Sequence, residues 1–196
     1  MLVENKISAV FLDADGVLWK DIGPGGILTG KNQSIINLKL LDSNQKKSQM
    51  KIVISNQTFA ARNKMNYLRF RVFTNYFFKS LIKLDLIHDF AVCYHHPNAN
   101  NSFLRKKCNC RKPLPGLIKS MMRKHNIAAH KSSLIGDRIT DIQSGAAAGI
   151  ENLFLIINSK MLEINENSSS QPLQTVFIPL KDLAEFSLIE EKKDEN

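Results

Sequence analysis

The sequence predicts an α/β fold of three layers, in which a parallel sheet carries helices on both of its faces. Two observations lead to this prediction. Short runs of β-branched and aromatic residues alternate with longer segments that have helical periodicity. Each of the short runs also ends in a polar residue, as strands do when they deliver functional groups to one edge of a sheet.

The expected elements follow one another in a regular strand and helix alternation. Five strands are expected, at residues 9–13, 51–55, 90–94, 133–137 and 152–156. The segments between them supply helices at 32–41, 60–84, 117–125 and 140–148. After a polar loop at 165–174, residues 175–178 could add an edge strand, and 179–188 read as a last helix with proline at its first position.

The length and composition fit one domain. The chain has 196 residues, 43% of them hydrophobic, which is enough for one well-buried core. We expect a single domain over 1–196, with its core at about 7–158, a metal-binding loop at 93–110, and an acidic tail after the last helix. The N-terminus lacks the pattern of a signal peptide, and no run approaches the roughly 18 apolar residues of a membrane span. These features predict a cytoplasmic protein without a membrane partner, expected to be a monomer.

The positive charge is concentrated in the middle of the chain. The formal net charge is +9, and residues 51–131 hold 16 lysines and arginines against two acids, Asp85 and Asp89. Such a segment suits an anionic ligand, which could be a small phosphate ester or a nucleic acid backbone. A solvated basic face is the plain alternative.

The residues that end the expected strands are the first candidates for a site, because ligands of open α/β sheets bind beyond the carboxyl ends of the strands. Asp13 ends the first strand, and Asp15 lies two residues later on the same face. Gly16 then permits a sharp turn. Two carboxylates aimed at one point are suited to acid and base chemistry, although an isolated pattern of this kind also occurs in ordinary turns.

Groups that bind phosphate or a cation follow the other strands. Ser55 and Asn56 offer a hydroxyl and an amide after the second strand. Further along the chain, Arg111 offers a planar fork and Lys112 a point charge. The fourth strand ends at Asp137 and is followed by Arg138 and Asp141, so two acids and one base lie close together in the sequence.

In this order the pieces resemble the four motifs of the haloacid dehalogenase (HAD) superfamily of phosphohydrolases, over about residues 9–156. The resemblance implies that Asp13 is the nucleophile, which forms an aspartyl-phosphate, and that Asp15 protonates the leaving oxygen and then activates water. It implies that Lys112 and Ser55 hold the transferring phosphoryl group. It further implies a catalytic Mg²⁺ bound by Asp13, the backbone carbonyl of Asp15, and Asp137, with Asp141 near its shell. No separate cap domain is expected.

All three cysteines lie in one loop beside two histidines. Cys93, Cys108 and Cys110, with either His95 or His96, make four soft ligands, which is enough for a closed tetrahedral Zn²⁺ site. Closed sites are structural. Because Cys110 directly precedes Arg111 and Lys112, a zinc ion that orders this polar loop would also position the phosphate-binding pair.

The loop resembles that of D-glycero-D-manno-heptose 1,7-bisphosphate phosphatases, which implies that His95 rather than His96 is the ligand. It also implies a Mg²⁺-dependent phosphatase that removes the 7-phosphate of this sugar, destined for surface lipopolysaccharide. Histidinol-phosphate phosphatases share a related loop and are the main alternative, with other phosphorylated sugars after them. A nucleic-acid 3′-phosphatase and a scaffold without catalysis are less favoured, the former because aromatic residues that stack bases are not interleaved with the basic ones.

Three departures from the family pattern fall where sugar recognition is expected. Ala14 replaces the usual arginine between the two aspartates, and Phe59 replaces a small glycine after the second strand. The stretch 18–26 also differs. Within it Trp19 and Lys20 could contact substrate, although Trp19 is equally suited to packing.

Overall fold

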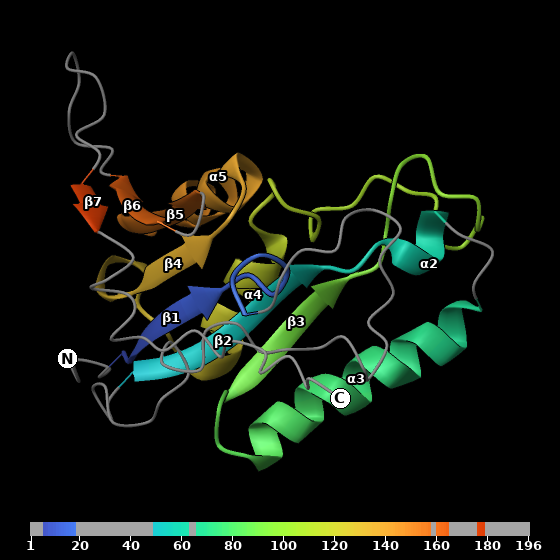
Figure 1. Cartoon of the computed structure of the whole chain (residues 1–196), viewed down its shortest axis with the longest axis horizontal. Coiled ribbons are helices and arrows are strands. Elements are labelled where there is room, and N and C mark those ends of the chain that lie inside the picture. The colour runs from blue at the N-terminus through green and yellow to red at the C-terminus, as the bar shows by residue number, and fades with distance from the viewer. Residues whose placement is uncertain (1–5, 19–48, 63–65, 158–159, 165–175, 179–196) are drawn as a thin grey trace, which may run out of the picture.

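The structure, a computed structural model, describes residues 6–18, 49–62, 66–157, 160–164 and 176–178 (Figure 1). The strands are β1 (Ser8–Leu12), β2 (Gln49–Asn56), β3 (Asp89–Cys93), β4 (Ser133–Gly136), β5 (Asn152–Ile157), β6 (Lys160–Ile164) and β7 (Val176–Ile178). The helices are α2 (Phe59–Arg62), α3 (Tyr67–Lys83), α4 (Gly116–His125) and α5 (Ile139–Ala148), with a 3-10 turn, η1, at Ala129–Lys131.

The strands form one sheet in the order β3-β2-β1-β4-β5-β6-β7. The first five pair in parallel, which confirms the predicted parallel sheet and its five strands. β6 was not predicted, and both β6 and β7 pair antiparallel, so they extend the sheet at the edge opposite β3. β7 lies at residues expected to form an edge strand.

Apolar residues on both faces of the central strands explain the layers. In β1 the side chain of Phe11 belongs to one buried cluster and that of Leu12 to the other, because successive side chains point to opposite faces. α4 and α5 pack on the Phe11 face, whereas α3 packs on the Leu12 face. Figure 1 shows α3 and α4 on opposite sides of β2. A parallel sheet covered in this way buries its strands and exposes their carboxyl ends.

The expected helix at 60–84 was wrong as a single element, since the structure has two helices there. α2 ends at Arg62, and α3 begins after Asn66, whose Oδ1 accepts hydrogen bonds from the backbone N–H groups of Leu68 (3.0 Å) and Arg69 (3.3 Å). This side chain satisfies donors that a helix start leaves without partners, and so it favours a new start at this residue.

The other helix predictions fare differently. α4 and α5 confirm those at 117–125 and 140–148, with each helix starting one residue earlier than expected. The helices expected at 32–41 and 179–188 and the polar loop at 165–174 lie outside the described residues. No helix in the described part of the chain is both long and apolar enough to cross a membrane.

Candidate active site

The carboxyl ends of β1, β2 and β4 open into a cleft of about 320 Å³. Its walls come from the segments that directly follow these strands and from the loop before α4. The lining residues are Asp13, Asp15, Asn56, Thr58, Arg62, Arg111, Lys112, Arg138, Ile139, Thr140 and Asp141. Four basic or acidic side chains predicted from the strand ends, together with Asn56, thus meet in one place with Arg111 and Lys112, which come from the distant loop.

Lys112 is the centre of a buried charge cluster at the floor of the cleft. Its Nζ lies 2.6 Å from Oδ1 of Asp13 and 2.6 Å from Oδ1 of Asp141, and it donates a hydrogen bond to the carbonyl of Ile54 at 3.2 Å. All three charged side chains are almost inaccessible to solvent. One ammonium group therefore faces two carboxylates and offsets the charge of only one of them, in a medium that screens charge poorly.

The pKa values follow from this arrangement. Burial raises the pKa of Asp13 well above its usual range, and the carboxylates of Asp141 and Asp15 add to the effect, while Lys112 opposes it. Burial by itself would lower the pKa of Lys112, but Asp13 and Asp141 outweigh it and raise that pKa. The lysine is thus held in its charged form, and a further cation close to Asp13 would favour the carboxylate form of that residue.

Gln57 fixes the second aspartate of the pair. Its Nε2 donates to Oδ2 of Asp15 and to Oγ of Ser55, each at 2.9 Å. Ser55 is fully buried and does not line the cleft, so its hydroxyl acts from behind Gln57. The amide orients one Asp15 oxygen while the residue still faces the cleft.

Asn56 connects the end of β2 to the loop that carries Lys112. The Asn56 side-chain amide donates to the Lys112 carbonyl and accepts from the Lys112 N–H, both at 3.2 Å. Two bonds in opposite directions fix the lysine backbone relative to the sheet. Asn56 therefore acts on Lys112 directly, in addition to lining the cleft.

A second acidic cluster contains Asp13, Asp137 and Asp141, each of which offers an oxygen within 4.8 Å of the others. The turn after β1 passes very close to Asp137 at Gly16, which has a φ of +82°. A Cβ added at Gly16 would collide with the Asp137 carboxylate, so only glycine permits this approach. Gly136 permits a similar approach by Asp141. Carboxylate oxygens are the ligands that Mg²⁺ prefers, so the donor set fits that ion.

The Cys/His loop brings its four expected ligands together. The sulfur atoms of Cys93, Cys108 and Cys110 lie 3.3–3.7 Å apart, and Nδ1 of His95 lies 3.3 Å from the Cys110 sulfur. These separations exclude disulfides, whose sulfur atoms are about 2.0 Å apart. They are close to the roughly 3.7 Å between sulfur ligands of a tetrahedral Zn²⁺. His96 instead accepts a hydrogen bond from the Asn98 N–H at 3.1 Å.

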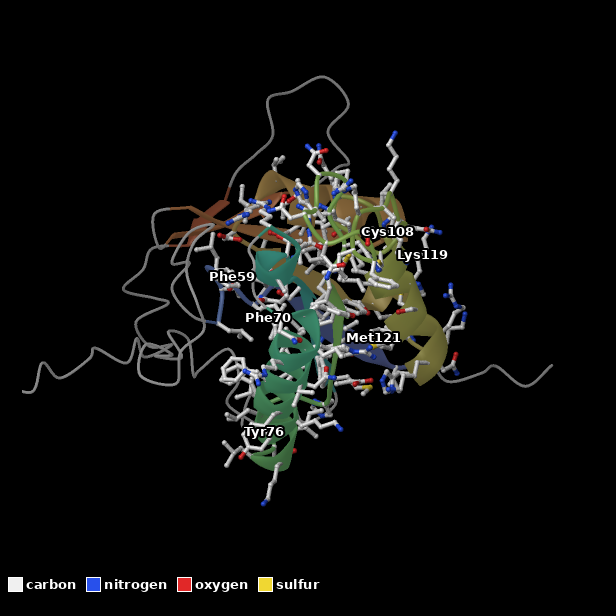
Figure 2. All side chains as sticks on the ribbon, turned by 90° about the vertical axis from the view of Figure 1, so that its right-hand side faces the viewer. Phe59, Phe70, Tyr76, Cys108, Lys119 and Met121 are labelled. Carbon is white, nitrogen blue, oxygen red and sulfur yellow. The ribbon has the colours of Figure 1, made fainter. Side chains whose placement is uncertain are left out.

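The Cys/His loop joins the cleft through Arg111. This side chain is half-buried, and its Nη1 donates to the carbonyl of His95 at 3.4 Å. Burial is the largest cause that lowers the pKa of Arg111, and the positive charges of Arg62 and Arg138 lower it further. Figure 2 shows Cys108 of this loop and Phe59 of α2 toward the same end of the molecule, away from Tyr76 in α3.

The structure places two of the departures from the family pattern in packed surroundings. Ala14 is completely buried in the core face shared with Leu12, and Phe59 packs on Phe70 of α3 with ring centroids 5.9 Å apart. Neither belongs to the described lining of the cleft. Trp19 and Lys20 lie outside the described residues.

Sequence reasoning missed four residues of the cleft, namely Thr58, Arg62, Ile139 and Thr140. Thr58 and Arg62 are four residues apart, and the Arg62 N–H donates to the Thr58 carbonyl at 3.2 Å. This spacing places both side chains on one face of the short helix that follows the second strand. The four-residue spacing could have indicated that these two side chains lie together, but only if a helix had been predicted to begin at this point.

The chain is similar to known phosphatases. The HAD-hydrolase-like family matches residues 109–160. The D-glycero-alpha-D-manno-heptose-1,7-bisphosphate 7-phosphatase of Photorhabdus laumondii is 32% identical over 160 residues, which cover 78% of this chain and 84% of that protein. The D-glycero-beta-D-manno-heptose-1,7-bisphosphate 7-phosphatase of Escherichia coli O6:H1 is 30% identical, with 80% and 83% covered.

A solved structure shares the fold. It is the D,D-heptose 1.7-bisphosphate phosphatase of B. bronchiseptica complexed with magnesium and phosphate, which has a TM-score of 0.61 and 21% sequence identity and covers 76% of this chain and 80% of that one. The level of identity to the curated relatives, over most of both chains, shows more than the fold. The chain therefore belongs to the HAD-type family of heptose bisphosphate phosphatases and is a phosphoric monoester hydrolase.

Proposed function

We propose that the protein removes the 7-phosphate of D-glycero-D-manno-heptose 1,7-bisphosphate in a reaction that depends on Mg²⁺. The observation that carries this proposal is the buried Asp13 and Lys112 pair at the floor of a cleft lined with arginines. A carboxylate beside a fixed ammonium group can attack an anionic phosphate, because the cation offsets the repulsion. The names of the curated relatives support the heptose substrate.

In the first step, an oxygen of Asp13 attacks the phosphorus atom and forms an aspartyl-phosphate. The described hydrogen bonds and ion pairs of this carboxylate, from the Ala14 N–H and from Lys112, end on Oδ1, so we assign the attack to Oδ2. As the bond from phosphorus to the sugar oxygen breaks, Asp15 donates a proton to that oxygen. Gln57 holds Asp15 in position for this transfer.

In the second step, water hydrolyses the aspartyl-phosphate. Asp15, now ionised, takes a proton from the water as its oxygen bonds to phosphorus, and the bond to Asp13 breaks to release phosphate. Lys112 faces the negative oxygens in both steps, and the Ser55 hydroxyl supports the site from behind Gln57. Each residue thus returns to its starting state.

The acidic cluster fits a divalent cation. Asp13, Asp137 and the backbone carbonyl of Asp15 would hold Mg²⁺, with Asp141 near its shell, and the ion would supply positive charge that offsets the charge of the phosphate and the carboxylates. Asp141 is also bound to Lys112 and accepts from the Arg138 N–H at 3.0 Å, so it positions both groups.

The cluster of Cys93, His95, Cys108 and Cys110 fits a structural Zn²⁺. Four protein ligands close the coordination shell and leave no position for substrate. The role of this ion would be to order the loop that ends in Arg111 and Lys112. Cysteines kept as metal ligands rather than disulfides also suit a reducing compartment, and we therefore place the enzyme in the cytoplasm.

The test is phosphate release from a panel of esters with Mg²⁺ present and then chelated. The panel holds both anomers of the heptose 1,7-bisphosphate, other sugar phosphates, histidinol phosphate and a 3′-phosphorylated oligonucleotide. We expect the highest kcat/KM on a heptose bisphosphate and loss of turnover on chelation, with heptose 1-phosphate identified as the product by phosphorus NMR.

The Asp13→Asn variant, purified in the same way, serves as the control for contaminating phosphatases. A higher kcat/KM on histidinol phosphate, another sugar phosphate or the oligonucleotide would replace the proposed substrate. Release of the 1-phosphate instead of the 7-phosphate would contradict the proposed regiochemistry.

A further inference from the structure

The cleft is lined by more basic side chains than the reaction steps described above use. Lys112 is buried at its floor beside Asp13, and three arginines, Arg62, Arg111 and Arg138, line its walls. The family motifs account for Lys112, Arg111 and Arg138. Arg62 lies outside those motifs and has no role in the steps described above.

The backbone at Arg62 is held firmly. Arg62 is the last residue of α2, and the preceding Ala60 and Ala61 are buried under the metal-binding loop with Leu104. Asn100 of that loop bonds to the end of the helix twice, since its N–H donates to the Ala61 carbonyl and its Nδ2 donates to the Arg62 carbonyl, both at 2.8 Å. The guanidinium group therefore extends into the cleft from a fixed base.

The charges around Arg62 are all of one sign. Its guanidinium group lies close enough to Arg111 and to the ring of His96 to lower the pKa of each. Among the described residues, no carboxylate lies within ion-pair distance of Arg62 or Arg111, whereas Arg138 lies 3.9 Å from Oδ2 of Asp137. Two neighbouring guanidinium groups without an acidic partner repel each other, and an anion between them removes that repulsion.

We propose that Arg62, together with Arg111, binds the phosphate group of the substrate that is not removed, and so determines the preference for a bisphosphate. This inference rests on the proposed function, in which the 7-phosphate meets Asp13 and Lys112. The remaining phosphate needs a second cationic site in the same cleft, and guanidinium groups bind phosphate through two parallel hydrogen bonds. Arg62 is thus a specificity-determining residue that contacts substrate away from the reacting atoms.

The test compares two substrates that differ by this one phosphate, namely heptose 1,7-bisphosphate in its preferred anomer and heptose 7-phosphate. For Arg62→Ala we expect kcat/KM on the bisphosphate to fall about tenfold or more, mainly through KM, because a charge-assisted hydrogen bond is lost in binding. On the monophosphate we expect a smaller fall, of less than about threefold, since the lost contact has no counterpart there.

Two further variants sharpen the comparison. Arg62→Lys keeps the charge but loses the planar fork, and we expect an intermediate effect on the bisphosphate. Arg69→Ala removes an exposed arginine of α3 outside the cleft, and we expect it to match the wild type on both substrates. Thermal unfolding followed by circular dichroism checks that the three variants fold.

Product inhibition tests the binding of the retained phosphate by itself, because the inhibitor carries no 7-phosphate. Heptose 1-phosphate carries only the phosphate that is assigned to Arg62, so its inhibition constant should rise about tenfold in Arg62→Ala. Equal losses on both substrates, or an unchanged inhibition constant, would overturn this inference alone. A wild-type enzyme without activity on heptose bisphosphate would overturn the proposed function and this inference with it.

Discussion

The Nζ atom of Lys112 lies 2.6 Å from Oδ1 of Asp13, and both side chains are almost completely buried. The two residues are far apart in the sequence, and the bonds between Asn56 and the Lys112 backbone hold the lysine at this position. The nucleophile and its charge partner are thus placed together before any substrate binds. Such preorganisation is the main contribution that a protein makes to phosphoryl transfer.

Replacement of this lysine should affect both stability and activity. We expect Lys112→Met to lower the free energy of unfolding by about 3 kcal/mol or more, because Asp13 and Asp141 are left buried without a compensating charge. Phosphate release should also become undetectable. Urea denaturation and a phosphate assay measure the two effects. Lys119→Met, an exposed change in α4, is the matched control and should change neither.

Removal of the nucleophile should abolish turnover and preserve the fold. We expect Asp13→Asn to lower kcat by at least about 10⁴-fold, as the loss of other enzymic nucleophiles does. Its unfolding midpoint should not decrease, since burial already disfavours the charged form of Asp13. Stopped assays with a radiolabelled ester give the required sensitivity. A variant that still turns over at the wild-type rate would remove Asp13 from this role.

The Cys/His cluster predicts which side chains retain zinc. Cys108→Ser and His95→Ala should each release the ion and lower both stability and activity, because the loop that carries Lys112 loses its anchor. His96→Ala removes the neighbouring histidine, which lies outside the cluster, and should keep the ion. Plasma emission spectroscopy of the purified proteins measures the metal. Unchanged zinc in Cys108→Ser would contradict the assignment.

The ion pairs of Asp89 should make part of the free energy of unfolding depend on pH in the acid range. Its Oδ2 lies 2.6 Å from Nζ of Lys124 and 2.6 Å from Nε2 of His125. Burial alone would raise the Asp89 pKa, but the hydrogen bonds from Lys124 and His125 lower it below the usual range of an aspartate. A lowered folded-state pKa gives stability that is present above the unfolded-state pKa and is lost as the pH falls through the folded-state pKa.

Accordingly, Asp89→Asn should cost about 1 kcal/mol at pH 7, a modest value because Lys124 is exposed. The difference from the wild type should shrink as the pH falls below about 4 and vanish at lower pH. Urea denaturation at a series of pH values provides the comparison. Asp85→Asn, at an exposed residue in the same segment, is the control for loss of one negative charge. A difference that grows toward acid would contradict the assigned pairing.

Alanine substitutions at two glycines with similar backbone angles distinguish the cost of backbone strain from the cost of a steric collision. Gly16 and Gly149 have φ values of +82° and +87°, so alanine at either should cost about 1–2 kcal/mol. An added Cβ meets only ordinary van der Waals contact at Gly149, whereas at Gly16 it collides with the Asp137 carboxylate. We therefore expect Gly16→Ala to be the less stable variant and the only one of the two with reduced phosphate release. Equal activity in both would mean that Asp137 can move without consequence.

Much of the fold could be predicted because the central strands have a strong local signal. The apolar runs at β1 through β5 need burial on both faces, and a parallel sheet covered by helices on both sides provides it. β6 was missed because only Asn158 and Ser159 separate it from β5, and this pair lacks the glycine that marks two-residue hairpins most clearly. The break between α2 and α3 depends on the cap formed by Asn66, and the apolar positions that predicted one helix over 60–84 carry no sign of that cap.

Some residues of the candidate site could also be predicted from the sequence, and others could not. Asp13, Asp15 and Lys112 belong to compact motifs, and the strand ends bring such motifs together whatever the details of packing. Arg62 could not be assigned, since its place depends on the two bonds from Asn100, a residue 38 positions later. The packed positions of Ala14 and Phe59 could not be predicted for a related reason, because only tertiary packing decides which face of a turn or short helix meets the core.

The order of the strands has a consequence for how this protein can be altered. The cleft is built from the ends of β1, β2 and β4 and from the loop before α4, whereas β6 and β7 lie beyond β5 on the other side of the sheet. We therefore expect a reporter domain or an affinity handle fused next to β7 to leave phosphate release unchanged, whereas an insertion at the carboxyl end of β1, β2 or β4 should abolish it.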